Sequence, residues 1–507
     1  MKQKMAYDVV IMGSGIGGLV TGLLLAKHGK KVCILEKNKQ YGGNLQTFVR
    51  DREILDSGVH YIGSLAKNET LGHYWEYLGV LDHIYFERMD PDKFDIIRFK
   101  GDLNEYPHAQ GHENYIKQLA KYFPEEKDAI VKYIETLQLY CSKFPLYELK
   151  KGYKHEDAIL SKSCIDVISS LTQNKKLQAV LLGNGFLYGL HADSPFYIHA
   201  LILNSYIQSS WRCIRGGNQI SKAFIKELRK HKAELFNNQE VNKLNFDNDI
   251  LISCETENCI YEASHFISNI SVLKLFKLFD KKNQNKPYVK RISELKEGPS
   301  AFSVHLVLKP NIIPYFNYNI YHFDHPNYVF GYNDNWNGYR PKSIIISCSP
   351  QEREHKFTSN ISMLTYMSYQ QVKAWEHTFN TTRFPQDRGK SYEFFKQKIA
   401  KEMITLLSDY FPGIQEHIIS IHTSTPLTYR DYIGTTTGAM YGIEKLASDF
   451  LATMVAPRTK VKNLFLSGQD VILHGILGVT ISGFLAAAEI LGYDTVFDDL
   501  FKEPPIV

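Results

Sequence analysis

The feature that most constrains the fold lies at the start of the chain, where a glycine-rich turn separates two apolar segments. Residues 7–12 predict a short buried strand, residues 19–28 predict a helix, and residues 31–35 predict a second strand. The turn between the first strand and the helix reads Gly13-Ser14-Gly15-Ile16-Gly17-Gly18. Because a helix that connects two strands returns the chain to the same edge of the sheet, the strands should pair in parallel. The sequence therefore predicts an α/β fold.

The glycines of this turn have the spacing of a dinucleotide-binding motif. Gly13 would allow a tight turn, Gly15 would let a pyrophosphate approach the backbone, and Gly18 would let the helix pack closely on the strand. The first turn of the helix would direct the positive end of its dipole at the phosphates. Ser14 and Gly17 complete the predicted phosphate site.

The acid that follows the second strand narrows the choice of nucleotide. Glu36 is placed to accept hydrogen bonds from ribose hydroxyls, and Lys37 is assigned to the same site. A carboxylate here would repel a 2′-phosphate, so the pattern favours FAD or NAD over NADP. A glycine turn of purely structural use is the alternative.

A second glycine-rich segment lies near the C-terminus. Residues 464–466 predict a short strand, after which Gly468-Gln469-Asp470 precedes a glycine-rich helix. Asp470 could hold the ribityl or pyrophosphate part of a flavin. A helix after Gly478, with Val479 assigned to the same site, would stabilise an anionic reduced flavin through its dipole. Alone, this segment fits a core helix equally well, but together with the N-terminal motif it favours FAD.

Four blocks of the sequence resemble the phytoene desaturase-related flavoprotein superfamily, and within it the branch of carotenoid isomerase and all-trans-retinol saturase. The N-terminal glycine motif and residues 464–470 are two of them. The others are residues 42–63, which end in His60-Tyr61-Ile62-Gly63, and residues 426–442, which include Thr428-Tyr429-Arg430-Asp431-Tyr432. Residues 65–180 and 310–420 match little of the family pattern.

The resemblance implies a role for several residues. Gly43, Asn44 and Asp470 would line the cofactor, and Val241 would contact its adenine side through the backbone. His60 and Tyr429 would lie toward the flavin face, where they are candidate catalytic residues. A structural role for either residue is an open alternative.

The resemblance also implies an architecture like that of amine oxidases and phytoene desaturases. A Rossmann-like FAD-binding domain would be discontinuous, formed by residues 1–100, 216–280 and 436–507. A second, α+β domain would bind the substrate and comprise residues 101–215 and 281–435. The lysine- and asparagine-rich residues 281–286 predict a loop.

The implied function is that of an FAD-dependent oxidoreductase that acts on carbon–carbon bonds of an apolar polyene, carotenoid-like or retinoid-like. Hydride transfer at flavin N5 would serve a saturase, a desaturase or an isomerase equally. Aromatic residues make up 13% of the chain, which suits a pocket for a large apolar ligand. If NAD(P)H supplies the electrons, it binds without a second glycine motif, and the sequence does not name the donor.

The alternatives are a flavin amine oxidase or a protoporphyrinogen-type oxidase, and a flavin-binding protein without catalysis. The amine oxidase pattern usually has arginines beside its glycine pair, whereas Gln40-Tyr41-Gly42-Gly43-Asn44 has none. The last cysteine is Cys348, so a cysteinyl flavin link near the C-terminal block is excluded and a non-covalent FAD is expected.

Charge and cysteine content restrict the partners. The net charge is +5 without a basic block, which argues against nucleic-acid binding. Seven cysteines without a CxxC pair predict free thiols in a reducing cytoplasm and no metal site.

Residues 471–491 are apolar enough to span a bilayer, but their glycines, His474 and Glu489 favour a buried helix. We therefore expect a cytoplasmic protein, with peripheral membrane contact compatible with its charge.

Overall fold

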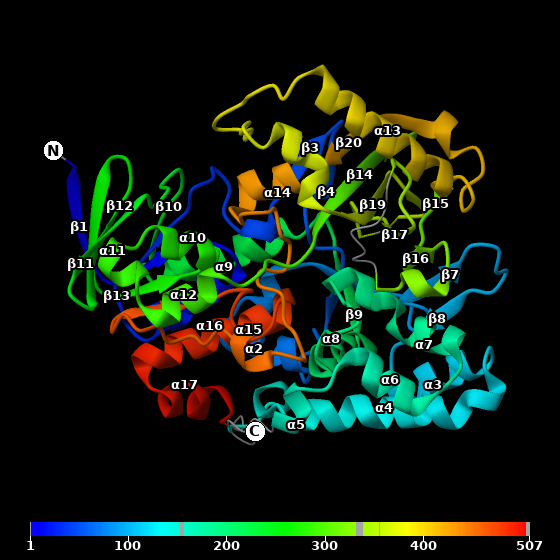
Figure 1. Cartoon of the computed structure of the whole chain (residues 1–507), viewed down its shortest axis with the longest axis horizontal. Helices are drawn as coiled ribbons and strands as arrows, with labels where there is room; N and C mark the ends of the chain where they lie inside the picture. Colours follow the sequence, from blue (N-terminus) through cyan, green and yellow to red (C-terminus); the bar gives the residue numbers. More distant parts are fainter. Residues whose placement is uncertain (1, 153–156, 331–337, 354, 503–507) are drawn as a thin grey trace.

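The computed structural model describes residues 2–152, 157–330, 338–353 and 355–502. It contains two seven-stranded sheets, which lie in different halves of the molecule (Figure 1). The first and last segments of the chain come together at one of these sheets, at the left of the view (Figure 1). The predicted α/β fold and the discontinuous Rossmann-like domain are therefore confirmed.

The first sheet is built on the N-terminal glycine motif. β1 pairs in parallel with β2 on one side, as the sequence predicted, and in parallel with β13 on the other. The strand order is β10-β2-β1-β13-β12-β11, and β21 pairs in parallel with the end of β13. The strands are β1 (Gln3–Met12), β2 (Val32–Leu35), β10 (Glu234–Phe236), β11 (Lys243–Asp247), β12 (Ile250–Glu255), β13 (Cys259–Ser268) and β21 (Leu464–Leu466).

Helices cover both faces of this sheet, which explains why its central strands are apolar on both sides. Val9 and Ile11 pack with α1, α9 and α16, whereas Val10 and Met12 pack with α10 and α12 on the opposite face. These helices are α1 (Ile16–Lys27), α9 (Asn218–Lys230), α10 (Val272–Lys277), α12 (Pro287–Ser293) and α16 (Gly475–Leu491).

The second sheet has the order β20-β14-β19-β17-β16-β7-β8 and is mostly antiparallel. α13 (Lys390–Leu407) packs on one face against β14, through residues such as Met403 and Phe302. The strands are β7 (Asp95–Phe99), β8 (Tyr106–His108), β14 (Ser300–Leu308), β16 (Asn319–Phe323), β17 (Ser343–Ser347), β19 (Asn360–Met367) and β20 (Ile418–Ser424).

The other face of the second sheet packs against a group of helices from the middle of the chain. Tyr321 and Tyr366 of this face share one core with Tyr133 and Phe196 of the helices. This arrangement is the α+β domain expected from the resemblance. The helices are α3 (His112–Ala120), α4 (Lys127–Ser142), α5 (Asp157–Leu160), α6 (Cys164–Leu171), α7 (Lys175–Leu182) and α8 (Phe196–Gln208).

The remaining helices and strands lie outside the two large sheets and the helices described above. They are β3 (Thr47–Arg50), β4 (Glu53–Asp56), β5 (Ile62–Gly63), β6 (Phe86–Arg88), β9 (Ser210–Cys213), β15 (Ile313–Pro314), β18 (Phe357–Thr358), α2 (Thr70–Leu78), α11 (Lys281–Gln284), α14 (Pro426–Ile433), α15 (Phe450–Thr453) and α17 (Tyr493–Leu500).

Three details differ from the sequence-based expectation. The segment predicted as a loop at 281–286 begins with the short helix α11, because the Asp280 side chain accepts a hydrogen bond from the Asn283 backbone and caps it. α16 begins at Gly475, one turn before the predicted start at Gly478. β7 pairs with β16, so the chain already enters the second sheet before residue 100. The exact domain boundaries remain predictions.

The apolar C-terminal segment forms a buried helix, as expected. Residues 478–488 of α16 are buried in the protein against α1 and its neighbours. Within the described ranges, no helix has both the length and the apolarity to cross a bilayer.

Candidate cofactor-binding and active site

The glycine turn after β1 has the geometry that the motif predicts. Gly13 has a φ of 98°, a left-handed value that favours glycine. A Cβ on Gly18 would lie 2.2 Å from the Gly13 carbonyl oxygen, so no other residue lets α1 approach the turn this closely. The first turn of α1 contains no acidic residue, which leaves its positive end free for an anion.

Glu36 connects this turn to the end of β2. One carboxylate oxygen accepts hydrogen bonds from the Ser14 backbone at 3.1 Å and from the Ser14 hydroxyl at 2.5 Å, and the other accepts from the Asn38 backbone at 2.9 Å. The Ser14 hydroxyl in turn accepts from the Gly42 backbone at 3.1 Å. Glu36 therefore orders the glycine turn, and its predicted contact with a ribose remains a prediction.

Asp470 joins three separate segments of the chain. Its two carboxylate oxygens accept hydrogen bonds from the backbone of Val272 at 2.8 Å and of Ile443 at 2.9 Å. Lys445 donates to the Asp470 backbone carbonyl at 2.8 Å. Burial raises the pKa of Asp470, and the Val272 hydrogen bond and the Lys445 charge oppose this shift. The carboxylate that was expected to hold the flavin is thus already bonded to the protein backbone.

The bonds of Asp470 lead to a first testable result. Asp470→Ala leaves two buried backbone donors without an acceptor, each worth about 1–3 kcal/mol. We expect at least tenfold weaker flavin binding, because the segments at Val272 and Ile443 border the same cavity region. Titration of apo-protein measures this, with the exposed Asp498→Ala as the control. Equal FAD affinity in both variants would show that the hydrogen bonds of Asp470 do not support the cofactor site.

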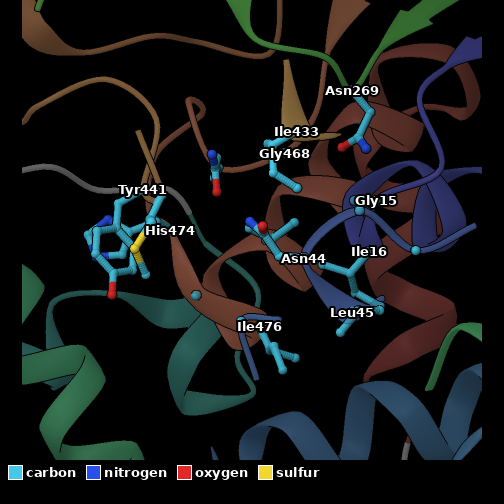
Figure 2. A pocket seen from close by; sticks show the side chains of 18 of the residues that line it. Gly15, Ile16, Asn44, Leu45, Asn269, Ile433, Tyr441, Gly468, His474 and Ile476 are labelled. Carbon is cyan, nitrogen blue, oxygen red and sulfur yellow. The ribbon is translucent and has the colours of Figure 1, made fainter. Parts of the chain in front are cut away.

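The N-termini of α1 and α16 meet at one cavity. The Thr21 hydroxyl on α1 donates to the Gly483 carbonyl on α16 at 3.1 Å, and so ties the two helices together. Figure 2 shows Gly15 and Asn269 on one side of the cavity and Tyr441 and His474 on the other, with Asn44 and Gly468 between them. The second glycine segment therefore faces the first, as the two motifs predicted.

Nearly all the predicted site residues line this cavity, which has a volume of about 270 Å³. The exception is Gly18, whose position behind the turn fits its expected packing role. The roles in binding and catalysis that were assigned to the predicted site residues remain predictions. The lining residues among them are Gly13, Ser14, Gly15, Gly17, Glu36, Lys37, Gly43, Asn44, His60, Val241, Tyr429, Gly468, Asp470, Gly478 and Val479.

The two candidate catalytic residues differ in what they can do with a proton. His60 has a pKa lowered to about 4, chiefly because it is buried, and its Nε2 atom has no hydrogen-bond partner. It is therefore neutral at pH 7. Tyr429 is buried, its pKa is raised by burial, and its hydroxyl lies 3.1 Å from the Ser303 hydroxyl. Tyr429 thus keeps its proton at neutral pH and has a partner to orient it.

Lys37 lies at the nucleotide end of the cavity. Its ammonium group donates to the Asp431 carbonyl at 2.8 Å, and burial, followed by the charge of Lys274, lowers its pKa to about 8. Lys274 is itself paired with Glu240 at 2.6 Å, and both residues line the cavity. This end of the cavity is therefore lined by charged side chains of both signs.

Asn269 also lines the cavity, although it was not predicted to belong to the site. Its side chain lies against the glycines of both motifs: a Cβ on Gly15 would come within 2.9 Å of it, and a Cβ on Gly468 within 2.7 Å. Its backbone donates to Met12 at 2.8 Å. Its position in the sequence could have indicated this, because Asn269 directly follows β13. The carboxyl ends of adjacent parallel strands meet at one edge of a sheet, where ligands bind.

A second residue that was not assigned is His474, the N-cap of α16. It is buried, its pKa is lowered to about 4 by burial, and its Nε2 atom has no hydrogen-bond partner. Its ring lies 5.1 Å from that of Tyr441 on the cavity wall (Figure 2). Among the described residues, no cluster of His, Cys, Asp or Glu could hold a metal ion.

Comparison with known proteins agrees with this geometry. Residues 11–78 match the NAD(P)-binding Rossmann-like domain family. The chain is 26% identical to an all-trans-retinol 13,14-reductase of Danio rerio, over 96% of this chain and 86% of that protein. It is 22% identical to prolycopene isomerase 2 of an Oncidium hybrid cultivar, over 96% and 85%. The resemblance to the retinol saturase and carotenoid isomerase branch is confirmed.

Two further comparisons concern the fold of the chain and the activity named for its relatives. Cyclohexylamine oxidase from Brevibacterium oxydans has a TM-score of 0.62 at 13% identity, covering 97% of this chain and 99% of that one, which confirms the amine oxidase-like fold. A Danio rerio relative named inactive all-trans-retinol 13,14-reductase is 24% identical, over 96% and 85%. At the level of class, the predicted oxidoreductase of the retinol saturase and carotenoid isomerase type is confirmed.

Proposed function

We propose that the protein binds FAD non-covalently and uses it to reduce, desaturate or isomerise one carbon–carbon bond of an apolar polyene, carotenoid-like or retinoid-like. The observation that supports this most is the meeting of the α1 and α16 N-termini at one cavity. A nicotinamide site needs one such helix, whereas a flavin dinucleotide offers both a pyrophosphate and a ring that becomes anionic on reduction.

The residues present fit this cofactor. The glycine turn and α1 would hold the pyrophosphate, and Glu36 and Val241 would bind the adenosine part. α16, which begins at Gly475 without an acid in its first turn, would face the isoalloxazine. No cysteine is among the residues that line the cavity, which supports a non-covalent flavin.

The flavin supplies the exchange of a hydride with a substrate carbon. The protein must orient the chain, exclude water and handle the proton that accompanies reduction. Around the flavin end of the cavity, aliphatic and aromatic side chains exclude water, among them Leu201, Ile202 and Tyr206 of α8. Tyr429 holds a proton at its hydroxyl at neutral pH, so it is our candidate for proton transfer, and His60 would position the chain as a neutral side chain.

The acids of the cavity favour a polyene over an amine. Glu36 and Asp470 are bonded to the protein backbone, and Glu240 is paired with Lys274. The cavity lining therefore offers a protonated amine no unengaged carboxylate. The amine oxidase-like fold keeps a flavin amine oxidase or a protoporphyrinogen-type oxidase as the second candidate. NAD(P)H as the reductant and a peripheral membrane contact belong to this proposal as well.

The cofactor is the first part of the proposal to test. The purified protein should be yellow, and acid precipitation should release all its flavin into solution, because no cysteine lines the site. Absorbance of supernatant and pellet measures this. Flavin that stays in the pellet would contradict the non-covalent link, and a colourless protein that cannot be reconstituted would contradict the proposed function.

The reaction type is tested by the product. Reduced and oxidised holoenzyme are each incubated anaerobically with a panel of polyenes. The products are then separated, and their molecular masses are determined by mass spectrometry. A product that gains hydrogen indicates a saturase, one that loses hydrogen a desaturase, and one of unchanged mass an isomerase. Turnover of amines or porphyrinogens, without any polyene product, would favour the second candidate.

A further inference from the structure

A second and larger cavity lies beside the proposed cofactor cavity. Its volume is about 1480 Å³, against about 270 Å³ for the cofactor cavity. Sites for single small ligands usually measure about 300–1,000 Å³. A dinucleotide would therefore take up most of the smaller cavity, and the neighbouring cavity offers room for a long substrate.

The two cavities share a wall. Tyr429 belongs to this wall and is 6% exposed, with its hydroxyl directed at Ser303 on β14. Three of the residues that line both cavities lie on α14, which carries the branch-like block of residues 428–432. The two cavities therefore adjoin at the candidate catalytic tyrosine. Six residues line both cavities: Asn38, Gly43, Asn44, Tyr429, Tyr432 and Ile433.

The larger cavity combines polar and charged side chains with a strip of isoleucines, and it opens at the surface. It lies between α13, β3 and β20, the outermost strand of the second sheet. Ile419 and Ile421 on β20 are 53% and 48% exposed. Isoleucines on an open strand edge are unfavourable in water unless something covers them. The apolar residues of the lining include Phe48, Ile404, Ile418, Ile419, Ile421 and Ile433.

We infer that this cavity binds the apolar chain of the substrate and brings the reacting bond past Tyr429 to the cofactor. The inference rests on the proposed function and extends it by naming where the substrate lies. A polyene chain offers almost no hydrogen-bonding groups, so its binding depends on removing apolar surface from water. The isoleucines of β20 and α13 provide such a surface. The exposed Lys39, Arg50 and Lys401 place hydrated charges at the opening of the cavity.

The experiment places a charge in this cavity. Ile421→Glu is compared in the holoenzyme with Ile252→Glu, a matched isoleucine that is 44% exposed on β12 of the other sheet. Binding of all-trans-retinol is followed by the fluorescence of the ligand, and steady-state turnover is measured in parallel. A carboxylate in an apolar site disfavours a hydrocarbon chain, so we expect at least about tenfold weaker binding and a similar rise in KM for Ile421→Glu.

The flavin content and the melting temperature should stay close to those of wild type in both variants, and Ile252→Glu should also keep the wild-type kcat. Equal retinol affinity in Ile421→Glu, Ile252→Glu and wild type would overturn the inference while leaving the proposed function intact. A wild-type holoenzyme that binds no polyene would overturn both. If Ile421→Glu only weakens sedimentation with anionic lipid vesicles, the surface is a membrane contact and the inference fails.

Discussion

Replacing Gly15 by valine should give a colourless protein that no longer binds FAD. A side chain here would occupy the space expected for the pyrophosphate, and its Cβ would lie 2.9 Å from the Asn269 amide, which it would displace. Because Asn269 also lies against Gly468, the second motif would move too. We expect affinity to fall by more than about a hundredfold, the loss of a phosphate contact and of packing together.

Titration of apo-protein with FAD measures the effect of Gly15→Val. Gly29→Asn is the matched control, because Gly29 ends the same helix region with open space around it, and asparagine tolerates its φ of 78°. The control should bind FAD like wild type. A yellow Gly15→Val protein with unchanged affinity would remove the glycine turn from the cofactor site.

Replacing Tyr429 by phenylalanine should have the second largest effect. The variant loses one hydroxyl between the two cavities, together with its contact to Ser303, and keeps the aromatic ring that forms the wall. A positioned proton donor typically contributes about 10²–10⁴-fold to rate. We therefore expect polyene reduction to slow by about a hundredfold at unchanged KM and flavin content.

Tyr432→Phe is the control for this variant. Tyr432 lies on the same helix and lines both cavities, but its hydroxyl accepts a hydrogen bond from the Thr382 backbone at 3.0 Å. Its rate should change little. The pH profile separates the two explanations, since a lost proton donor alters the basic limb of the kcat profile, whereas a packing defect lowers the rate equally at every pH. A similar loss in both variants would give Tyr429 a structural role.

The Rossmann-like half could be predicted because its signals are local. Gly13 and Gly18 are fixed by backbone geometry, and the strands around them alternate between two covered faces. The parallel pairing of β1 with β2 follows from the helix between them. The resemblance added the division of the chain into two domains.

The rest of the site depends on contacts between residues far apart in sequence. The two carboxylate oxygens of Asp470 accept backbone hydrogen bonds from Val272 and Ile443, and no local sequence pattern predicts such bonds. The larger cavity depends on β20 being the outermost strand, which only the sheet order shows. α11 was missed because a single Asp280 cap outweighs a loop-like composition.

The central claim is that the bound flavin exchanges electrons with, or isomerises, a polyene. The most direct test is the absorbance spectrum of dithionite-reduced holoenzyme, kept free of oxygen, after addition of all-trans-retinol and of longer polyenes. We predict that the polyene band shifts, either with return of the oxidised flavin band, as in a saturase, or without it, as in an isomerase. An unchanged polyene spectrum, together with rapid bleaching of the oxidised flavin by an amine or a porphyrinogen, would contradict the account.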